Sequence, residues 1–319
     1  MTTNMIIGMY AHHAGSGHLH RARAIQHHLD TDSVVFSSAE GADITLPLDL
    51  DPDSAPDDQT AGGTLHWAPV GVEGLSTRLA IIAQWIARHH PSVFYVDCSV
   101  EVAAFVRLMG IPVITIAMPG VRFDDTHQLG YSQASAIIAA WPDWVPIPPH
   151  LTAHADRLHM VGGISRFESI DGGETAAQRE GVVILRGVGG DDFDSQDWPE
   201  ATVLGGGDVL VSDPTPHLRA ASVVIATAGQ NSVADIALTG APAIIFPQER
   251  PFGEQYATAT ILEEAELAVV PPSFPSPAQW EELIELAAHR AENWHRWQTA
   301  GAAQRAAAVI DQVAANNKG

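Results

Sequence analysis

Histidines gather around a glycine turn in one short segment of the chain, AHHAGSGHLHRARAI. His12, His13, His18 and His20 fall within nine residues of sequence. Such a set fits three kinds of chemistry. They are zinc binding by ligands that converge at about 2.0–2.1 Å, phosphate binding by glycine-rich backbone, and proton transfer near neutral pH. Each predicts a different protein, so the expected directions of the side chains are decisive.

The spacing of these histidines disfavours a metal site. His12 and His13 are adjacent at the end of a predicted strand, so their side chains should point to opposite faces. His18 and His20 straddle one residue at a helix start, where their side chains should diverge by roughly 200°. We therefore expect no metal cofactor.

The sequence of the same turn indicates a catalytic base rather than a dinucleotide-binding site. The sequence GSGHLHRA lacks the third glycine of GxGxxG, and the acidic residue expected at the end of the second strand is ambiguous. Gly15, Ser16 and Gly17 form a tight turn that exposes the next side chain, His18, at the mouth of a cleft. Histidine is well suited to remove a proton from a hydroxyl group. We expect His18 to be the base, with His13 as second candidate; a plain helix-start residue is the alternative.

A second polar set follows a strand that ends in the sequence ATAGQNS. A helix should begin at about Gln230. The first turn of a helix offers unpaired N–H groups and a partial positive charge, which suit a diphosphate. Gly229 allows close approach of the backbone, and Thr227 and Ser232 add hydroxyl groups.

Side chains that could hold sugars come later in this half. Asp235 lies one turn further along the helix and could accept from both hydroxyls of a ribose. Glu254 and Gln255 open the following helix and could grip neighbouring sugar hydroxyls. All of them follow carboxyl ends of predicted strands, where open α/β sheets bind ligands. The alternative is an ordinary strand–helix–strand unit with helix caps.

Short β-rich runs alternate with helical runs, which predicts parallel strands with helices on both faces. A connector rich in proline and glycine interrupts the alternation, which then restarts. We predict an α/β protein of two doubly wound, Rossmann-like domains that face each other across a cleft. Residues 1–160 would form the first domain, 161–178 a linker and 179–319 the second domain, with C-terminal helices returning to the first domain. We also expect a strand over 64–70 and a helix over 127–140.

The second half resembles the donor-binding half of GT-B fold glycosyltransferases. It is similar to the peptidoglycan N-acetylglucosaminyltransferase family and to UDP-sugar transferases with the signature HCGWNS…E…G.P…P…DQ. The matching residues are Thr227-Ala228-Gly229-Gln230-Asn231-Ser232, Asp235, Gly240-Ala241-Pro242, Pro247 and Glu254-Gln255. The resemblance extends weakly to AGSGHLHRARAI and to HMVGGISR. Thr227 departs from the signature's histidine, and Asp235 from its glutamate.

The resemblance implies an inverting glycosyltransferase that moves a sugar from a nucleotide-diphosphate donor to a hydroxyl acceptor in the N-terminal domain, with UDP as the expected nucleotide. A role in cell-envelope glycan synthesis is one implication. His18 would take the acceptor proton, and the helix start would stabilise the leaving diphosphate without a metal. The glycine turn of Gly187, Gly189 and Gly190 would face the phosphates, and the backbone at Ser212 would read the base. The alternatives are a UDP-sugar 2-epimerase and a non-catalytic sugar-nucleotide-binding subunit.

Other candidates lie after strands of the first half. The loop in MPGVRFDDTHQLGY carries Arg122, Asp124 and His127, which could contact the acceptor; a polar surface loop is the alternative. Asp97 ends a strand and is either a cleft residue or a helix cap.

Composition limits the partners of the protein. The formal net charge of −22 opposes binding to nucleic acid or to an anionic membrane through a broad basic surface. No apolar run approaches the roughly 20 residues needed to cross a bilayer, so we expect at most peripheral membrane contact. One cysteine and no signal-peptide pattern predict a cytoplasmic protein.

Overall fold

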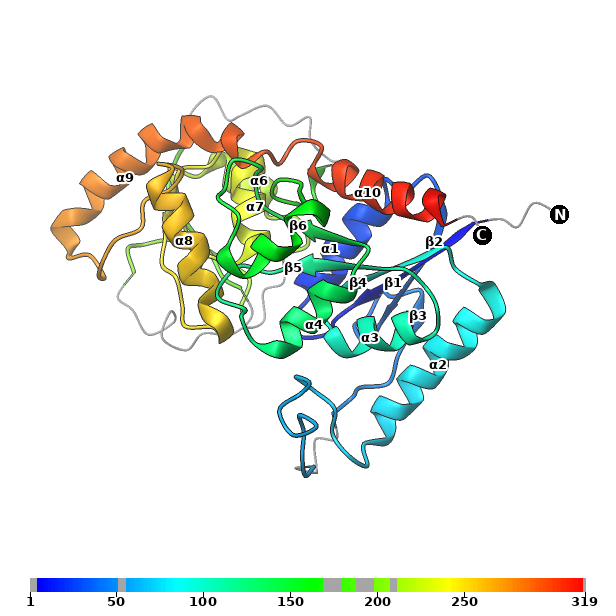
Figure 1. The fold of residues 1–319 in the computed structure, drawn as a ribbon. Coiled ribbons are helices and arrows are strands. Elements are labelled where there is room, and N and C mark those ends of the chain that lie inside the picture. Colours follow the sequence, from blue (N-terminus) through cyan, green and yellow to red (C-terminus); the bar gives the residue numbers. More distant parts are fainter. Residues whose placement is uncertain (1–4, 51–55, 169–178, 188–197, 207–210, 318–319) are drawn as a thin grey trace.

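The computed structural model describes most of the 319-residue chain, namely residues 5–50, 56–168, 179–187, 198–206 and 211–317. Its helices and strands build two parallel sheets with helices packed around them (Figure 1). The prediction of an α/β protein with two doubly wound sheets is confirmed.

The first sheet has seven parallel strands in the order β3-β2-β1-β4-β5-β6-β7. Their bounds are β1 Ile6–Ala11, β2 Asp32–Ser37, β3 Ile44–Thr45, β4 Val93–Asp97, β5 Val113–Ala117, β6 Ala136–Ala139 and β7 Leu158–Met160. The central strands are continuous buried runs, as parallel strands covered on both faces require. β1 and β4 are neighbours, with Ala11 beside Asp97, so the residues that follow these two strands lie close together.

The second sheet has four parallel strands in the order β11-β10-β8-β9. They are β8 Val182–Leu185, β9 Thr202–Leu204, β10 Val223–Ala226 and β11 Ala243–Ile245.

Helices cover both sheets. Beside the first sheet lie α1 Gly17–Gln26, α2 Glu73–His89, α3 Val100–Leu108 and α4 Asp125–Gln133, followed by the 3-10 helix η1 Pro149–Arg157. The later elements are α6 Thr215–Ala220, α7 Gln230–Thr239, η3 Pro251–Gly253, α8 Glu254–Glu264, η4 Pro277–Gln279, α9 Trp280–Arg290, η5 Ala291–Trp297 and α10 Ala302–Asn316.

The last helix belongs to the core of the first sheet. Ala302, Ala306 and Ile310 of α10 are fully buried at helical spacing against α1 and the strands (Figure 1). The preceding η5 packs instead in the core of the second sheet through Trp294 and Trp297. The end of the chain therefore joins the two halves.

Two predicted elements are wrong. Residues 64–70 form no strand, because the backbone N–H groups of His66 and Trp67 are bound by the Glu101 carboxylate rather than by a neighbouring strand. The helix expected over 127–140 ends at Gln133, and β6 follows it. The run Ala-Ile-Ile-Ala of β6 is buried on both faces, which a sequence pattern cannot distinguish from a buried helical turn.

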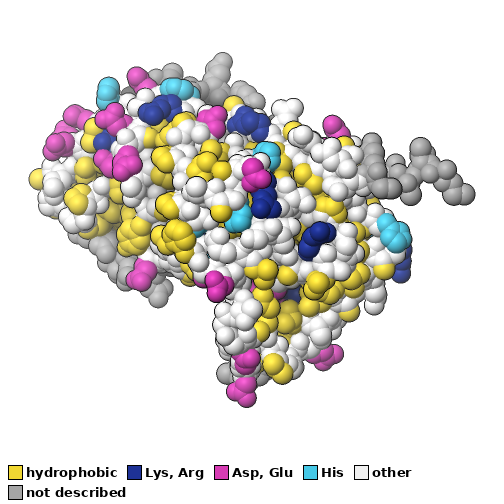
Figure 2. All heavy atoms as spheres, viewed as in Figure 1, with side chains coloured by type: hydrophobic (Ala, Val, Ile, Leu, Met, Phe, Trp, Pro, Cys, Tyr) yellow, Lys and Arg dark blue, Asp and Glu magenta, His cyan; other side chains and the backbone are white. Residues whose placement is uncertain are grey.

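In the part of the chain that the structure describes, no helix is both long and apolar enough to cross a membrane. On the face shown in Figure 2, basic side chains lie singly among acidic and apolar ones. This face presents no continuous basic surface to a polyanion among the residues drawn.

Candidate active site

The glycine turn of the first half lies against the helix start of the second. Gly15 has a φ of +83°, and α1 begins directly after Ser16. A Cβ atom on Gly17 would stand 2.7 Å from Nδ2 of Asn231, so only glycine fits there without moving that side chain. The predicted juxtaposition of AGSGH and TAGQNS is therefore present in the structure.

A cavity of about 610 Å³, counting its part open to solvent, lies between these two segments and is called the central cavity here. Its lining comes from both halves: Ala14, Gly17, His18, Arg21, Met118 and Pro119 from the first, and Ala228, Gly229, Gln230, Asn231, Ser232, Glu254 and Thr258 from the second. The structure thus brings His18 and the start of α7 to one cavity.

His18 is paired with a buried carboxylate. Its Nδ1 lies 2.8 Å from Oδ1 of Asp97, which is fully buried at the end of β4. The hydroxyl of Tyr95 donates to the other carboxylate oxygen at 3.0 Å. Because a carboxylate only accepts, the neutral form of the ring carries its hydrogen on Nδ1, which leaves the lone pair on Nε2. Asp97 therefore lies buried behind His18 and lines neither cavity described here, while the cap of α3 is Ser99.

Arg21 binds the same carboxylate beside His18, since both contact Oδ1 of Asp97. Nε and Nη2 of Arg21 each donate to one oxygen of Asp97 at 2.8 Å, and the side chain is 3% exposed. Its Nη1 donates to Oε1 of Gln230, at the start of α7, at 3.1 Å. Burial alone would raise the pKa of Asp97, but Arg21 and His18 outweigh it and hold that pKa well below its usual range. Asp97 therefore stays ionised beside His18.

Arg21 was not among the candidates from the sequence. Its position three residues after His18 on α1 places both side chains on one helix face, which is the only sequence signal for it. Its partner Asp97 lies 76 residues away, and β1–β4 pairing creates the contact.

His12 and His13 do not point apart, so that prediction is wrong. Their rings stack with centroids 4.7 Å apart and planes 16° from parallel. The reason is that β1 ends at Ala11, so strand alternation no longer applies to them. With Asp49 they bring three possible ligand atoms within 4.8 Å, although Arg78 already binds that carboxylate. The absence of a metal requirement stays a prediction.

The fourth histidine of the segment lies apart from this group. His20 contacts Nη1 of Arg166, in the connector between the halves, through a ring nitrogen at 2.7 Å. Arg166 also donates to the backbone carbonyl of Ser212 at 3.2 Å. Ser212, the predicted base-reading position, is thus tied to the connector.

The Asp235 side chain is more buried than a side chain that binds ribose at an open surface would be. It is 8% exposed, and Oγ of Ser165 donates to it at 2.6 Å. Burial raises the pKa of Asp235 to about 6, although Ser165 and Arg166 oppose the rise. Asp235 does not line the central cavity; it lies beside the connector, close to the segment of Ser212.

Of the predicted sugar-binding pair, only Glu254 lines the central cavity, where Nη2 of Arg122 donates to it at 3.2 Å. Gln255 is buried, and its side-chain oxygen accepts from the backbone N–H groups of Ala228 at 3.3 Å and Gln248 at 2.9 Å. Gln255 therefore fixes two loops instead of presenting its amide oxygen to the cavity.

The remaining donor-side candidates follow the carboxyl ends of β10 and β8, the two central strands of the second sheet. Thr227 is buried, and a Cβ on Gly187 would lie 3.9 Å from its hydroxyl. Gly189 and Gly190 lie outside the described residues.

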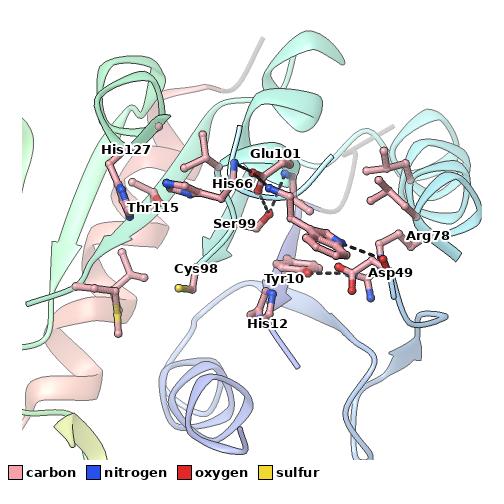
Figure 3. A pocket seen from close by; sticks show the side chains of 18 of the residues that line it. Tyr10, His12, Asp49, His66, Arg78, Cys98, Ser99, Glu101, Thr115 and His127 are labelled. Atoms are coloured by element: carbon pink, nitrogen blue, oxygen red, sulfur yellow. Dashed lines mark hydrogen bonds and ion pairs between the residues drawn. The ribbon is translucent and has the colours of Figure 1, made fainter. Parts of the chain in front are cut away.

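The acceptor-side loop is held in place by its own side chains. Asp124 caps α4, accepting from the backbone N–H of His127 at 3.0 Å, and its carboxylate also meets the rings of His127 and His66. Arg122 lies 4.4 Å over the ring of Phe252, from the second half. Of the three predicted residues, only His127 lines a cavity of the first half, shown in Figure 3.

Residues 171–312 match the model of the Glycosyltransferase family 28 C-terminal domain. The match spans the second sheet and continues into α10. No functionally curated protein is similar enough in sequence to count as a match.

Solved structures are similar over nearly the whole chain. MurG of Acinetobacter baumannii has a TM-score of 0.62 at 15% identity, covering 97% of this chain and 99% of MurG. A UDP-glucosyltransferase from Polygonum tinctorium, described as capable of glucosylating indoxyl, has a TM-score of 0.65 at 14% identity, covering 99% and 100%. The calicheamicin glycosyltransferase CalG4 has a TM-score of 0.61 at 15% identity, covering 98% of each chain. The shared architecture is the GT-B fold that the resemblance in sequence implied.

Proposed function

We propose that this chain, which has the GT-B fold and matches the Glycosyltransferase family 28 C-terminal domain in its second half, is a glycosyltransferase. It would transfer a sugar from a nucleotide-diphosphate donor, UDP-linked by preference, to a hydroxyl group of an acceptor, with inversion at the anomeric carbon. One observation carries this proposal. His18, which is paired with the buried Asp97 of the first half, and a helix N-terminus of the second half line the same cavity.

The start of α7 suits the diphosphate of the donor. Gly229 precedes the helix without a side chain, so the first N–H groups of Gln230, Asn231 and Ser232 are accessible from the cavity. Their partial positive charge would stabilise the diphosphate as it leaves. In this proposal the helix supplies the charge that a metal supplies in other transferases, so no metal cofactor is needed.

His18 supplies the base. As the acceptor oxygen attacks the anomeric carbon, Nε2 of His18 takes the hydroxyl proton, and the bond from that carbon to the diphosphate breaks. The ionised Asp97 stabilises the imidazolium that forms and fixes the ring orientation. Arg21 is a positioning residue, since it holds Asp97 and contacts Gln230 at the donor side.

The nucleoside would lie further along the second half. Asp235 would accept from the ribose hydroxyls, and the backbone near Ser212 would contact the base. Glu254, which lines the central cavity, would accept from a hydroxyl of the transferred sugar.

A screen of nucleotide sugars by thermal shift tests the donor, and turnover with His18→Ala tests the base. We expect sugars linked to one kind of nucleotide to raise the melting temperature of the wild type and of His18→Ala equally. Turnover of His18→Ala should fall by about 10²–10⁴-fold, the usual contribution of a general base. Unchanged turnover would remove His18 from the mechanism. Interconversion of donors without an acceptor would identify an epimerase, and binding without any turnover would identify a non-catalytic subunit.

A further inference from the structure

The first half contains a cavity of its own, which we call the first-half cavity (Figure 3). Its empty space, counted together with the mouth that is open to solvent, is about 800 Å³. It opens where β1, β4 and β5 end, between α2, α3 and α4.

This cavity adjoins the base. Met118 lines both the first-half cavity and the central cavity. The ring of His12 lies 6.0 Å from the ring of His18, and Cys98 of the lining follows Asp97 directly. A hydroxyl group at the inner end of a ligand would therefore lie near His18.

Charged side chains of the lining already have hydrogen-bond partners within the protein. Arg78 is 1% exposed and donates to the Asp49 carboxylate, to the Tyr10 hydroxyl and to the carbonyl of Pro47. Glu101 accepts from the backbone N–H groups of His66 and Trp67. Figure 3 shows these pairs along the wall of the cavity. The cation of the wall, Arg78, is thus already paired with a carboxylate.

Two histidines of the lining are uncharged at neutral pH. Burial lowers the pKa of His12 to about 4, helped by its neighbours His13 and His18. Burial also lowers the pKa of His127 to about 4, although its hydrogen bond with Asp124 opposes this. They offer a hydrogen bond to a neutral ligand and no counter-charge to an ionic one.

The rest of the wall is largely apolar. It includes Leu75, Leu79, Val102, Ile116 and Tyr131. An anionic ligand would leave water for a wall whose arginine is already paired with Asp49, which costs several kcal/mol per charge. A neutral aromatic or alicyclic ligand would instead bury apolar surface, at about 25 cal/mol per Å².

We propose that the first-half cavity binds the acceptor, and that the acceptor is a compact, uncharged, mainly apolar molecule with a hydroxyl group, such as a fused-ring phenol. This rests on the proposed function of the neighbouring site. A lipid-linked phosphate is the competing acceptor class, and the test below includes it.

The test is calorimetric titration of wild type and His18→Ala at pH 7.5, without donor, with 1-naphthol, 1-naphthyl phosphate and farnesyl phosphate. We expect both proteins to bind 1-naphthol at least tenfold more tightly than either phosphate. Tighter binding of a phosphate overturns the proposal.

Substitutions in the lining test whether 1-naphthol binds in the first-half cavity. Leu79→Trp fills it and should weaken 1-naphthol binding at least tenfold. The matched control Leu108→Trp, at a position 86% exposed on α3, should bind like wild type. Cooperative thermal unfolding serves as the folding control, and Leu75→Phe makes the same comparison if Leu79→Trp does not fold. Unchanged binding in a folded, filled variant refutes the location.

The outcome separates this proposal from the function on which it rests. If 1-naphthol binds as expected and no nucleotide sugar supports transfer, the proposed transfer fails. If transfer is found to an acceptor that does not compete with 1-naphthol, the transfer stands and the acceptor proposal fails.

Discussion

Asp235 on α7 should cost the protein stability at neutral pH, and Asp235→Asn should recover it. The carboxylate is 8% exposed, and burial raises its pKa to about 6 from an ordinary value of 3.8. The Ser165 hydroxyl can donate to an asparagine oxygen as it does to the carboxylate at 2.6 Å. The substitution therefore removes the charge and keeps the hydrogen bond.

The magnitude follows from the raised pKa of Asp235. Between pH 4 and pH 6 the folded state binds more protons than the unfolded state, so the free energy of unfolding falls as pH rises and levels off above about pH 6. The pKa difference corresponds to roughly 3 kcal/mol. Asp235→Asn should equal wild type near pH 4 and exceed it by up to about 3 kcal/mol at pH 7.5.

Urea unfolding of both proteins at several pH values between 4 and 7.5 measures this difference. Glu264→Gln, at an exposed position of α8, is the control and should show none. The same Asp235 variant should bind the nucleotide donor about tenfold or more weakly, because a hydrogen bond to a charged group is lost. A variant that is less stable than wild type at pH 7.5, or a gain that does not vary with pH, would refute the reasoning.

Three further predictions concern contacts between distant segments. Asp97→Asn should lower turnover about 10²–10⁴-fold with donor affinity unchanged, because His18 loses the carboxylate that orients it; equal loss of both in steady-state kinetics would contradict this. Arg21→Met should cost about 3–5 kcal/mol of stability in urea unfolding, and the double variant with Asp97→Asn should cost less than the two single changes together; additivity would show that the pair is not coupled. Gly120→Ala should lower both melting temperature and turnover, because its Cβ would stand 2.3 Å from the carbonyl oxygen of Phe252 in the other half; an unchanged melting curve would contradict the contact.

Periodicity was sufficient for the main elements of the fold. Apolar runs such as VFYVD and VVIA predicted parallel strands, and Gly240 predicted the end of α7, where it adopts a left-handed φ of +60°. It failed for β6, a four-residue buried run, and for residues 64–70, whose backbone hydrogen bonds go to a side chain. Both errors come from tertiary contacts that no local pattern records.

By itself, the sequence determined the chemistry that is available: a histidine after a glycine turn, and a helix start suited to a diphosphate. Only the tertiary structure decided the partners. It placed Asp97 and Arg21 beside His18 because β1 and β4 are neighbours in the sheet, and it stacked His12 on His13 because β1 ends before them. It also turned Gln255 to the backbone of two loops and enclosed Asp235 behind Ser165. Residue type fixes what a group can do, whereas burial and neighbours, contributed by segments far apart in sequence, fix what it does.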